Sequence, residues 1–280
     1  MMNIKIWGCR GSLPAPGTDK DIYGGNTSCI EIIDGDTCII LDGGSGLQRL
    51  NNYLPPNITR IDILLTHLHL DHIMGLGFFW PLYNPNMTVN IWGPAASNES
   101  LAQRLRRYFS PPIFPVRLNE LPCKGELFEI DSSEFQIGNF KITSEYVCHP
   151  GPTVAYRLQT GNTVIAYIPD HEPALGSSQF PTNAEWTSGF SIAEGADILF
   201  HDAQYSSEEY KTRVGWGHSS VEDALDFGTL ARVKKIVLFH HDPAHTDDNL
   251  KTMLAETLEE KKCDFEVEIA TEGASFEFES

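Results

Sequence analysis

Residues 66–72 of this chain read Thr66-His67-Leu68-His69-Leu70-Asp71-His72, directly after the apolar run 61–65. The length and branched side chains of that run predict a buried β-strand, and α/β folds place ligands just beyond such strands. Imidazole suits zinc, and a carboxylate suits a second or harder cation. Because side chains alternate in an extended chain, His67 and His69 point to one side, whereas Asp71 and His72 diverge toward a neighbouring ion. The stretch therefore predicts a metal site rather than a polar surface loop.

The composition is that of a soluble enzyme. The chain has 280 residues, enough for one large α/β domain or two small ones, and its 41% hydrophobic content supports a sizeable core. No apolar run of about 18 residues occurs, so we expect no membrane-spanning helix. The N-terminus leads directly into a predicted strand at 4–7, so we expect no signal peptide. Six scattered cysteines without C-x-x-C spacing predict reduced thiols in a cytoplasmic protein.

The formal net charge of −18 restricts the partners of the protein. Proteins that bind long nucleic acids usually present a basic face, because their affinity depends on contacts to phosphate. The acidic balance therefore disfavours a long polyanionic partner. A small anionic substrate stays open, because bound cations would dominate the local field.

The chain reads as a single domain over residues 1–280, without repeats, low-complexity tracts or linkers. Besides 4–7 and 61–65, its first part predicts strands at 28–33 and 37–41, joined by a hairpin turn. The Gly-rich turn after Asp42 lacks the lysine and spacing of a phosphate loop. We expect this turn to let the backbone pass beneath the metal loop, with Asp42 accepting a hydrogen bond from a histidine N–H.

Residues 76–125 differ in composition from the rest of the chain, because aromatic side chains are interleaved with prolines there. We interpret this segment as an insert. Ser97 is expected to cap a helix whose apolar face includes Leu101 and Leu105. The arginines within 104–107 form the one basic cluster of this acidic chain. A solvated helix face and a phosphate-docking role stay equal alternatives for them. The insert is expected to form a pocket wall or a dimer surface.

The second half of the chain places further metal-ligand types at the ends of predicted strands. Three such strands end at His149, at Asp170 and at the pair His240-His241. His149 is suited to be a third ligand for the first ion, and the carboxylate of Asp170 could bridge two cations. One histidine of the last pair offers a final imidazole. Three such residues in succession favour a metallohydrolase over ordinary loops.

The spacing H-x-H-x-D-H after a hydrophobic strand, with these later partners, resembles the metallo-β-lactamase superfamily of metal-dependent hydrolases. The resemblance implies an α/β fold, a four-layer αβ/βα sandwich of two mixed sheets with helices outside and metals at one rim. It implies two divalent ions, and zinc, manganese and iron all accept such ligands. His240 is preferred to His241 because it directly ends its strand. The implied ligands are His67, His69 and His149 for the first ion, Asp71, His72 and His240 for the second, and Asp170 as the bridge.

Two later segments resemble the branch of this superfamily that contains RNase Z, the endonuclease that trims transfer-RNA 3′ ends, and related phosphodiesterases. Residues 201–204, H-D-A-Q, resemble its H-E-A-T segment with Asp in place of Glu, and residues 217–220, G-H-S-S, resemble its H-S-T segment. The catalytic residues implied by this resemblance are His218 and Asp202.

A physical argument supports the same pair. Ser219 and Glu222 predict a capping box at the start of the next helix, which would hold His218 at a fixed position. Paired with Asp202, His218 is predicted to stay protonated near neutral pH and to donate to a leaving alkoxide. The alternative is that His218 only packs against Trp216, and Asp in place of Glu shortens the reach of the acid.

Residues 67–72 also match the H-x-H-L-D-H opening of class II cyclic-nucleotide phosphodiesterases, although 77–80 lack the small and hydroxyl residues of that signature. The segments 7–12 and 23–28 resemble bacterial members of the same group. Asp71 and Asp170 are expected to orient the attacking water, which adds Asp71 to the catalytic residues. The candidate substrate contacts are Arg10, Asn26 and His241.

The predicted function is a dinuclear metal-dependent hydrolase, a phosphodiesterase acting on a small phosphodiester such as a 3′,5′-cyclic nucleotide. The chain lacks the long basic arm with which RNase Z clasps transfer RNA, and its charge opposes long nucleic acid. The alternatives are an RNase Z-like nuclease, a thioesterase or lactonase, and a non-catalytic regulatory module that binds metal or nucleotide. We expect a small-molecule substrate and no membrane partner, and the aromatic-rich insert is compatible with a homodimer.

Overall fold

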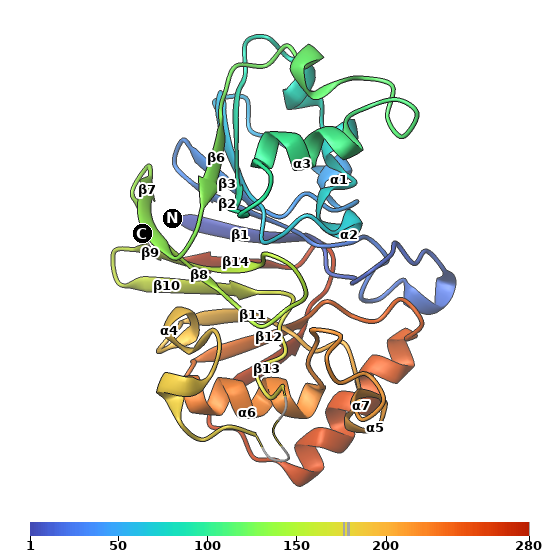
Figure 1. The fold of residues 1–280 in the computed structure, drawn as a ribbon. Helices are drawn as coiled ribbons and strands as arrows, with labels where there is room; N and C mark the ends of the chain where they lie inside the picture. Colours follow the sequence, from blue (N-terminus) through green and yellow to red (C-terminus); the bar gives the residue numbers. More distant parts are fainter. Residues whose placement is uncertain (176, 178–179, 280) are drawn as a thin grey trace.

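Two mixed β-sheets lie face to face in the computed structural model of the chain, which describes residues 1–175, 177 and 180–279 (Figure 1). The first sheet has the order β14-β1-β2-β3-β4-β5-β6, and the second has the order β13-β12-β11-β10-β9-β8-β7. The strands of the first sheet are β1 (Met2–Gly8), β2 (Cys29–Asp34), β3 (Thr37–Leu41), β4 (Arg60–Leu64), β5 (Thr88–Pro94), β6 (Leu127–Ile130) and β14 (Ser275–Phe278). The strands of the second are β7 (Ser133–Ile137), β8 (Phe140–Tyr146), β9 (Val154–Thr160), β10 (Thr163–Ile168), β11 (Ile198–Asp202), β12 (Lys235–Phe239) and β13 (Glu266–Ile269).

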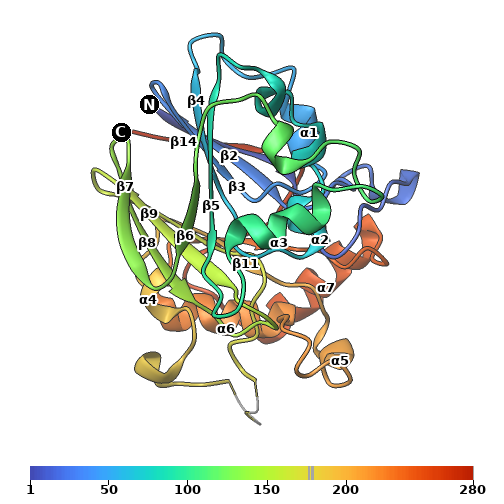
Figure 2. The same cartoon turned by 45° about the horizontal axis from the view of Figure 1, so that its top comes forward.

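Helices cover the outer face of each sheet. The α-helices are α1 (Leu47–Leu50), α2 (Leu70–Ile73), α3 (Leu101–Tyr108), α4 (Phe190–Ala193), α5 (Ser207–Tyr210), α6 (Val221–Ala231) and α7 (Asp247–Glu260). Short 3-10 helices lie at Thr18–Lys20, Leu76–Phe78, Trp80–Tyr83, Leu118–Glu120 and Ala184–Trp186. The C-terminal strand β14 returns to the first sheet and pairs with β1, so the two termini lie near each other (Figure 2).

Three groups of buried apolar side chains fill the spaces between these layers. The central group joins the facing surfaces of the two sheets. A second group packs the first sheet against α1, α2 and α3, and a third packs the second sheet against α4 and α6. The order helix, sheet, sheet, helix confirms the predicted α/β four-layer αβ/βα sandwich.

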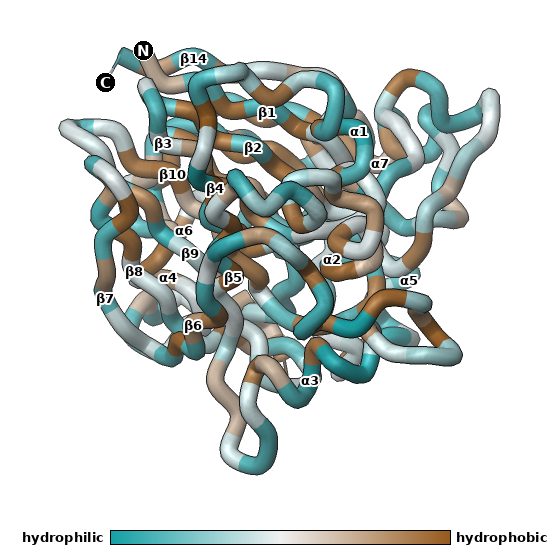
Figure 3. The backbone as a smooth tube through the Cα atoms, turned by 90° about the horizontal axis from the view of Figure 1, so that it is seen from above, coloured by the Kyte–Doolittle hydropathy of each residue, from teal (hydrophilic) through white to brown (hydrophobic). Residues whose placement is uncertain are grey.

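Strand β3 shows why the sequence builds these layers. Its side chains alternate, so Ile39 and Leu41 enter the central core while Cys38 and Ile40 enter the outer core. A strand buried on both faces reads as a continuous apolar run rather than an alternating one. Hydrophobic segments accordingly recur along β1, β2 and β4 (Figure 3).

Parallel pairing sends several strands to one rim of the sandwich. Strands β3 to β6 pair in parallel, and so do β10 to β13. Strand β9 is antiparallel to both β8 and β10, so β8 ends at the same rim. The loops after β4, β8, β10, β11 and β12 therefore meet there, which is where open α/β sheets place ligands.

Two helix caps differ from the prediction. Ser100, not Ser97, caps α3, and it forms a capping box with Gln103. Ser220, whose hydroxyl accepts from the backbone N–H of Asp223, caps α6 instead of the predicted Ser219. In each case neighbouring polar residues offered the same cap chemistry at nearly the same place, and tertiary contacts selected one.

Residues 76–125 are not wholly an insert, because 88–94 form strand β5 inside the first sheet. The remainder, with α3, covers the outer face of that sheet. Within the described residues, no helix is long and apolar enough to cross a membrane. The six cysteines are free thiols, as predicted.

Candidate metal centre

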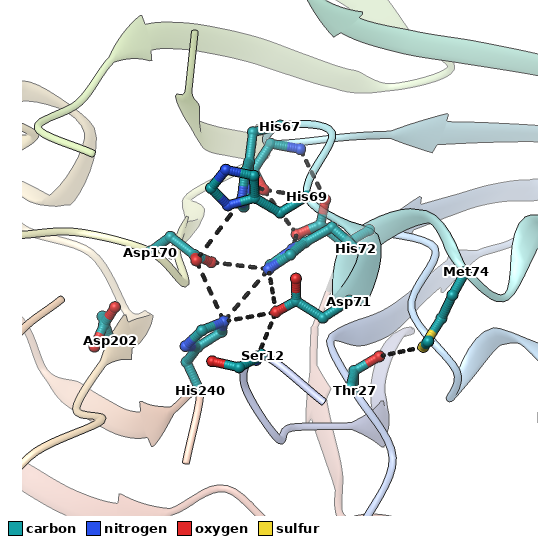
Figure 4. Close-up of polar contacts among 12 residues, drawn as sticks. Ser12, Thr27, His67, His69, Asp71, His72, Met74, Asp170, Asp202 and His240 are labelled. Atoms are coloured by element: carbon teal, nitrogen blue, oxygen red, sulfur yellow. Dashed lines mark hydrogen bonds and ion pairs between the residues drawn. The ribbon is translucent and has the colours of Figure 1, made fainter. Parts of the chain in front are cut away.

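The seven side chains predicted as metal ligands meet at the rim of the sandwich. Figure 4 shows His67, His72, Asp71, Asp170 and His240 converging on one space. Ligand atoms lie within 4.8 Å of one another in the sets His67–His69–His149, His67–His72–Asp170 and Asp71–His72–His240. Segments far apart in the sequence thus supply two adjoining groups of donors.

Asp170, just after β10, lies between these two groups. Its Oδ2 is 3.8 Å from Nε2 of His67 and 3.8 Å from Nε2 of His149. The same oxygen is 3.3 Å from Nε2 of His240, and its Oδ1 is 3.1 Å from Nε2 of His72. One carboxylate therefore reaches both groups, as a bridging ligand must.

Three of the histidines are held in the tautomer that binds metal. In each, Nδ1–H donates to an acceptor outside the cluster, so Nε2 is the ring atom that faces the shared space. The pairs are His72 with Asp42 Oδ2 at 2.8 Å, His149 with the carbonyl oxygen of Gly217 at 2.8 Å, and His240 with Gln204 Oε1 at 3.0 Å.

The donor set fits divalent cations. His67 Nε2 is buried and makes no hydrogen bond, and Asp170 Oδ1 is buried with only the ion-pair contact to His72 Nε2 at 3.1 Å, although buried polar atoms are normally satisfied. Two imidazole nitrogens, His149 Nε2 and His69 Nδ1, face each other at 3.3 Å. Either a hydrogen bond between these nitrogens or a cation bound by both accounts for this spacing, and imidazole with carboxylate is a donor set that zinc and its neighbours accept.

The carboxylates of the cluster are held in their ionised form. Burial alone would raise the pKa of Asp170, but the imidazoles of His240 and His72 outweigh it and hold that pKa well below its usual value. The pKa of Asp71 is lowered in the same way, chiefly by His72 against the effect of burial. Burial would lower the pKa of His72, yet the surrounding carboxylates, Asp170 first, raise it well above its usual value.

Asp42 positions parts of the donor cluster through hydrogen bonds. It is fully buried and accepts a hydrogen bond from the backbone N–H of Thr66 at 2.7 Å, from His72 Nδ1 and from the hydroxyl of Tyr167 at 2.9 Å. The expected hydrogen bond from a histidine N–H to Asp42 is therefore present. Asp42 orients His72 and also anchors the first residue of the ligand-bearing loop.

Replacing Asp42 with Asn is expected to lower zinc affinity by about 10- to 100-fold, because the amide nitrogen cannot accept from His72 or Tyr167. Affinity is measured by competition with a chromophoric chelator. Asp62→Asn is the matched control, since Asp62 is a buried carboxylate on β4 that binds Arg60, Asn90 and Trp92 instead. Equal losses of affinity in both variants would contradict the role given to Asp42.

His218 and Asp202 lie beside the donors. Nδ1 of His218 donates to Oδ2 of Asp202 at 2.6 Å, so Asp in place of Glu still reaches it. Burial opposes charging of His218, but Asp202 outweighs burial and raises the pKa of His218 to about 9. The ring stacks on His240 at 4.9 Å, whereas Trp216 is 60% exposed to solvent. His218 thus lies at the edge of the cluster with its pKa raised by Asp202.

Two of the predicted substrate contacts, Arg10 and His241, are buried away from solvent. Arg10 is fully buried, and it donates to the carbonyl oxygens of Gly24, Asp242 and His245. This burial corrects the prediction that Arg10 contacts a substrate, because the guanidinium presents no surface to solvent. Its role is to tie three backbone segments together.

His241 and Asn26 are also engaged elsewhere. His241 is buried against the carbonyl oxygen of Ala270 at 3.0 Å, and burial lowers its pKa to about 3. It is therefore neither a ligand nor exposed to a substrate, which corrects that prediction. The side-chain amide of Asn26 donates to Glu272 at 3.1 Å and accepts from Ser45 at 3.0 Å.

Several supporting residues were missed from the sequence. The backbone N–H of Ser12 donates to Asp71 at 2.7 Å, and a Cβ on Gly11 would collide with the ring of His240. The segment 7–12 was noticed only for its resemblance, which was the available signal. Glu172, buried, accepts from the backbone N–H groups of Gly215 and Gly217 and so holds the carbonyl that orients His149. No pattern in the sequence points to Glu172.

Comparison with known proteins agrees with this geometry. The family model described as beta-lactamase superfamily domain matches residues 37–241. Ribonuclease Z of Haloarcula marismortui is 25% identical, over 85% of this chain and 86% of its own. The solved metallo-β-lactamase fold protein YhfI from Bacillus subtilis superposes with a TM-score of 0.70 at 22% identity, covering 98% of each chain. A diphosphatase from the PhnP family superposes with a TM-score of 0.69 at 19% identity, over 100% of this chain and 98% of that one.

Proposed function

The chain belongs to the beta-lactamase superfamily, and from that premise we propose that it is a dinuclear metal-dependent phosphodiesterase acting on a small phosphodiester such as a 3′,5′-cyclic nucleotide. The observation that carries the proposal is the hydrogen bond of 2.6 Å between His218 and Asp202 at the edge of the donor cluster. A proton donor beside the cations suits an ester whose leaving group is an alkoxide. A thioester needs no such donor, because a thiolate leaves more readily.

The roles proposed for the ligands follow the two groups of donors. The first ion would be held by His67, His69 and His149, the second by Asp71, His72 and His240, and both by Asp170. Divalent cations there would supply Lewis-acid chemistry, neutralising charge on a phosphate and making water more acidic. Zinc, manganese and iron all suit this donor set.

The side chains of the protein perform the remaining steps. Asp71 and Asp170, ionised and acceptor-only, would orient an attacking water by accepting its hydrogen bonds. His218 would donate its proton to the departing oxygen of the substrate, and Asp202 keeps that proton in place near neutral pH. The backbone N–H of Ser12 holds Asp71, so the carboxylate keeps its orientation.

The proposal is tested by turnover of the purified protein, reconstituted with zinc or manganese. The substrates are bis(p-nitrophenyl) phosphate and 3′,5′-cyclic AMP, with a thioester and a lactone in parallel. Hydrolysis of both phosphodiesters above the thioester and lactone rates supports the proposal. Hydrolysis of the generic diester alone keeps the chemistry but discards the cyclic nucleotide. A metal-loaded protein that cleaves neither diester would sink the phosphodiesterase assignment.

An RNase Z-like nuclease is the second candidate, favoured by the name of the Haloarcula relative. The net charge of −18 opposes it, because binding to long RNA depends on phosphate contacts. Binding of an oligoribonucleotide with an affinity that falls steeply as salt rises would favour the nuclease. Affinity for a small diester that changes little with salt would favour the smaller substrate.

Two further expectations stay proposals. Six free thiols support a cytoplasmic location, since reducing compartments keep cysteines unpaired. Exposed apolar side chains at Phe78, Trp80 and Ile113 support a homodimer through residues 76–125.

A further inference from the structure

A cavity of about 240 Å³ adjoins the metal donors on the side of α3. His67 and His69 lie at one side of it, and the loop 150–152 forms another wall. Arg104, Arg107 and Tyr108 of α3 form a further wall, and Leu68 and Ile73 supply apolar lining. This volume lies just below the roughly 300–1,000 Å³ typical of whole-ligand sites, so it suits one group of a substrate whose reacting part lies at the donors.

The position of the two arginines is set by the helix. Arg104 and Arg107 are three residues apart and so share one face of α3, together with Tyr108. The hydroxyl of Tyr108 donates to the carbonyl oxygen of Met74 at 2.7 Å, which ties α3 to the segment after α2. Figures 1 and 2 both draw α3 close to α2. Arg106 points elsewhere and lines a separate apolar cavity with Leu82 and Leu118, among others.

The cavity is unusually cationic for this chain. Among the described residues that line it, none carries a carboxylate, although acidic residues outnumber basic ones by 38 to 20 in the sequence. The guanidinium Nε of Arg104 is buried and makes no hydrogen bond. Arg104 thus offers a buried N–H group without an acceptor, and it lines a cavity that has no carboxylate among its described residues. This combination indicates an anionic ligand.

The second arginine is available for such a ligand. Arg107 pairs with Glu99 at 2.5 Å, but its side chain is 71% exposed, and exposed ion pairs contribute little to stability. Arg104 is more firmly held, since it binds the carbonyl oxygen of Pro94 and lies 3.7 Å from Glu129. Arg104 is thus a fixed wall of the cavity, and Arg107 is a side chain that can turn toward a ligand.

We propose that this cavity binds a second phosphate of the substrate, separate from the phosphodiester at the metal donors. The inference rests on the proposed function and narrows it to small phosphodiesters that also carry a terminal phosphate. The planar guanidinium matches phosphate through parallel hydrogen bonds, which a point charge does not. The small volume and the acidity of the whole chain favour a small molecule over a polymer.

The test uses flexible probes with one phosphate or two. The zinc-loaded protein is titrated calorimetrically with diol bisphosphates from ethylene glycol to hexanediol, and with the alkyl monophosphates of the same lengths. At the best length we expect the bisphosphate to bind at least about tenfold more tightly, the size of one charged hydrogen bond. Arg107→Gln should remove that advantage. Arg106→Gln, on the same helix but outside the cavity, should keep it.

Each outcome decides the matter. A bisphosphate advantage at no length, or one that survives in Arg107→Gln, would overturn the inference. The inference would also be overturned if Arg107→Gln weakened binding of an oligoribonucleotide while the bisphosphates bound no more tightly than the monophosphates. That result would assign the cavity to the backbone of a polymer. Hydrolysis of bis(p-nitrophenyl) phosphate is followed in parallel, because its absence would instead reject the proposed function. Circular dichroism confirms that both variants are folded.

Discussion

Replacing Asp170 with Ala is expected to reduce kcat/KM for phosphodiesters by at least about a thousandfold, and to lower the metal content of the purified protein. Among the carboxylates of the described residues, Asp170 alone lies within 4 Å of imidazoles from both donor groups, namely His67, His149, His72 and His240. Its loss would remove the negative charge that the two proposed cations share, and stabilisation of transition-state charge by metals amounts to several kcal/mol. Metal content is measured by inductively coupled plasma mass spectrometry.

Asp197→Ala is the matched control for this prediction. Asp197 is also an aspartate beside a strand of the second sheet, but it precedes β11 at the opposite end and binds Lys234 and the backbone N–H of Val164. It should lose neither metal nor turnover. Full metal content and near-normal turnover in Asp170→Ala would refute the bridging role.

Replacing His218 with Ala is expected to lower kcat by a factor that depends on how basic the leaving group of the substrate is. With cyclic AMP, whose leaving oxygen is an alkoxide, the loss should be about 10²- to 10⁴-fold, the usual contribution of a general acid. With bis(p-nitrophenyl) phosphate the loss should be far smaller, because p-nitrophenolate leaves without a proton. Steady-state rates on both substrates give the ratio of the two losses in kcat.

The ratio separates a proton donor from a packing residue. His218 stacks on His240, so its loss could also disturb that ligand. A disturbed ligand would lower both rates equally, and that result would contradict the proton-donor role. His245→Ala is the control, since His245 binds Glu209 at 3.0 Å away from the donors and should leave both rates near the wild-type values.

Local patterns in the sequence predicted most of the strands but not β5, β6, β7, β13 or β14, and the failure at β5 has a physical cause. Residues 88–94 were interpreted as part of an insert because the surrounding segment 76–125 interleaves aromatic side chains with prolines, and Asn90, Gly93 and Pro94 stand among the apolar residues of the strand itself. The sheet accepts them because Asn90 is satisfied by Asp62 and by the backbone N–H of Glu126. Such partners come from distant segments, so a window of sequence cannot contain them.

The choice between His240 and His241 was likewise a matter of backbone geometry. His240 has a positive φ of 62°, a conformation that non-glycine residues rarely adopt except at functional sites. At this position the imidazole of His240 reaches the donors while His241 turns to the carbonyl oxygen of Ala270. The sequence favoured His240 because it ends the strand and matches the place of the last histidine in the family that the chain resembles.

The sequence by itself determined the buried strands and the cluster of ligand types at 67–72, because periodic burial and close spacing are local properties of a chain, whereas the four-layer fold and the full ligand set followed from the family resemblance. Only the tertiary structure decided which nitrogen of each histidine faces the cluster, since the acceptors that hold them are Asp42, Gln204 and the carbonyl of Gly217. It also decided that Arg10 is structural and that Arg104 and Arg107 border the cavity. Those outcomes depend on which distant segments share a volume, and that is a property of the packed chain rather than of any stretch within it.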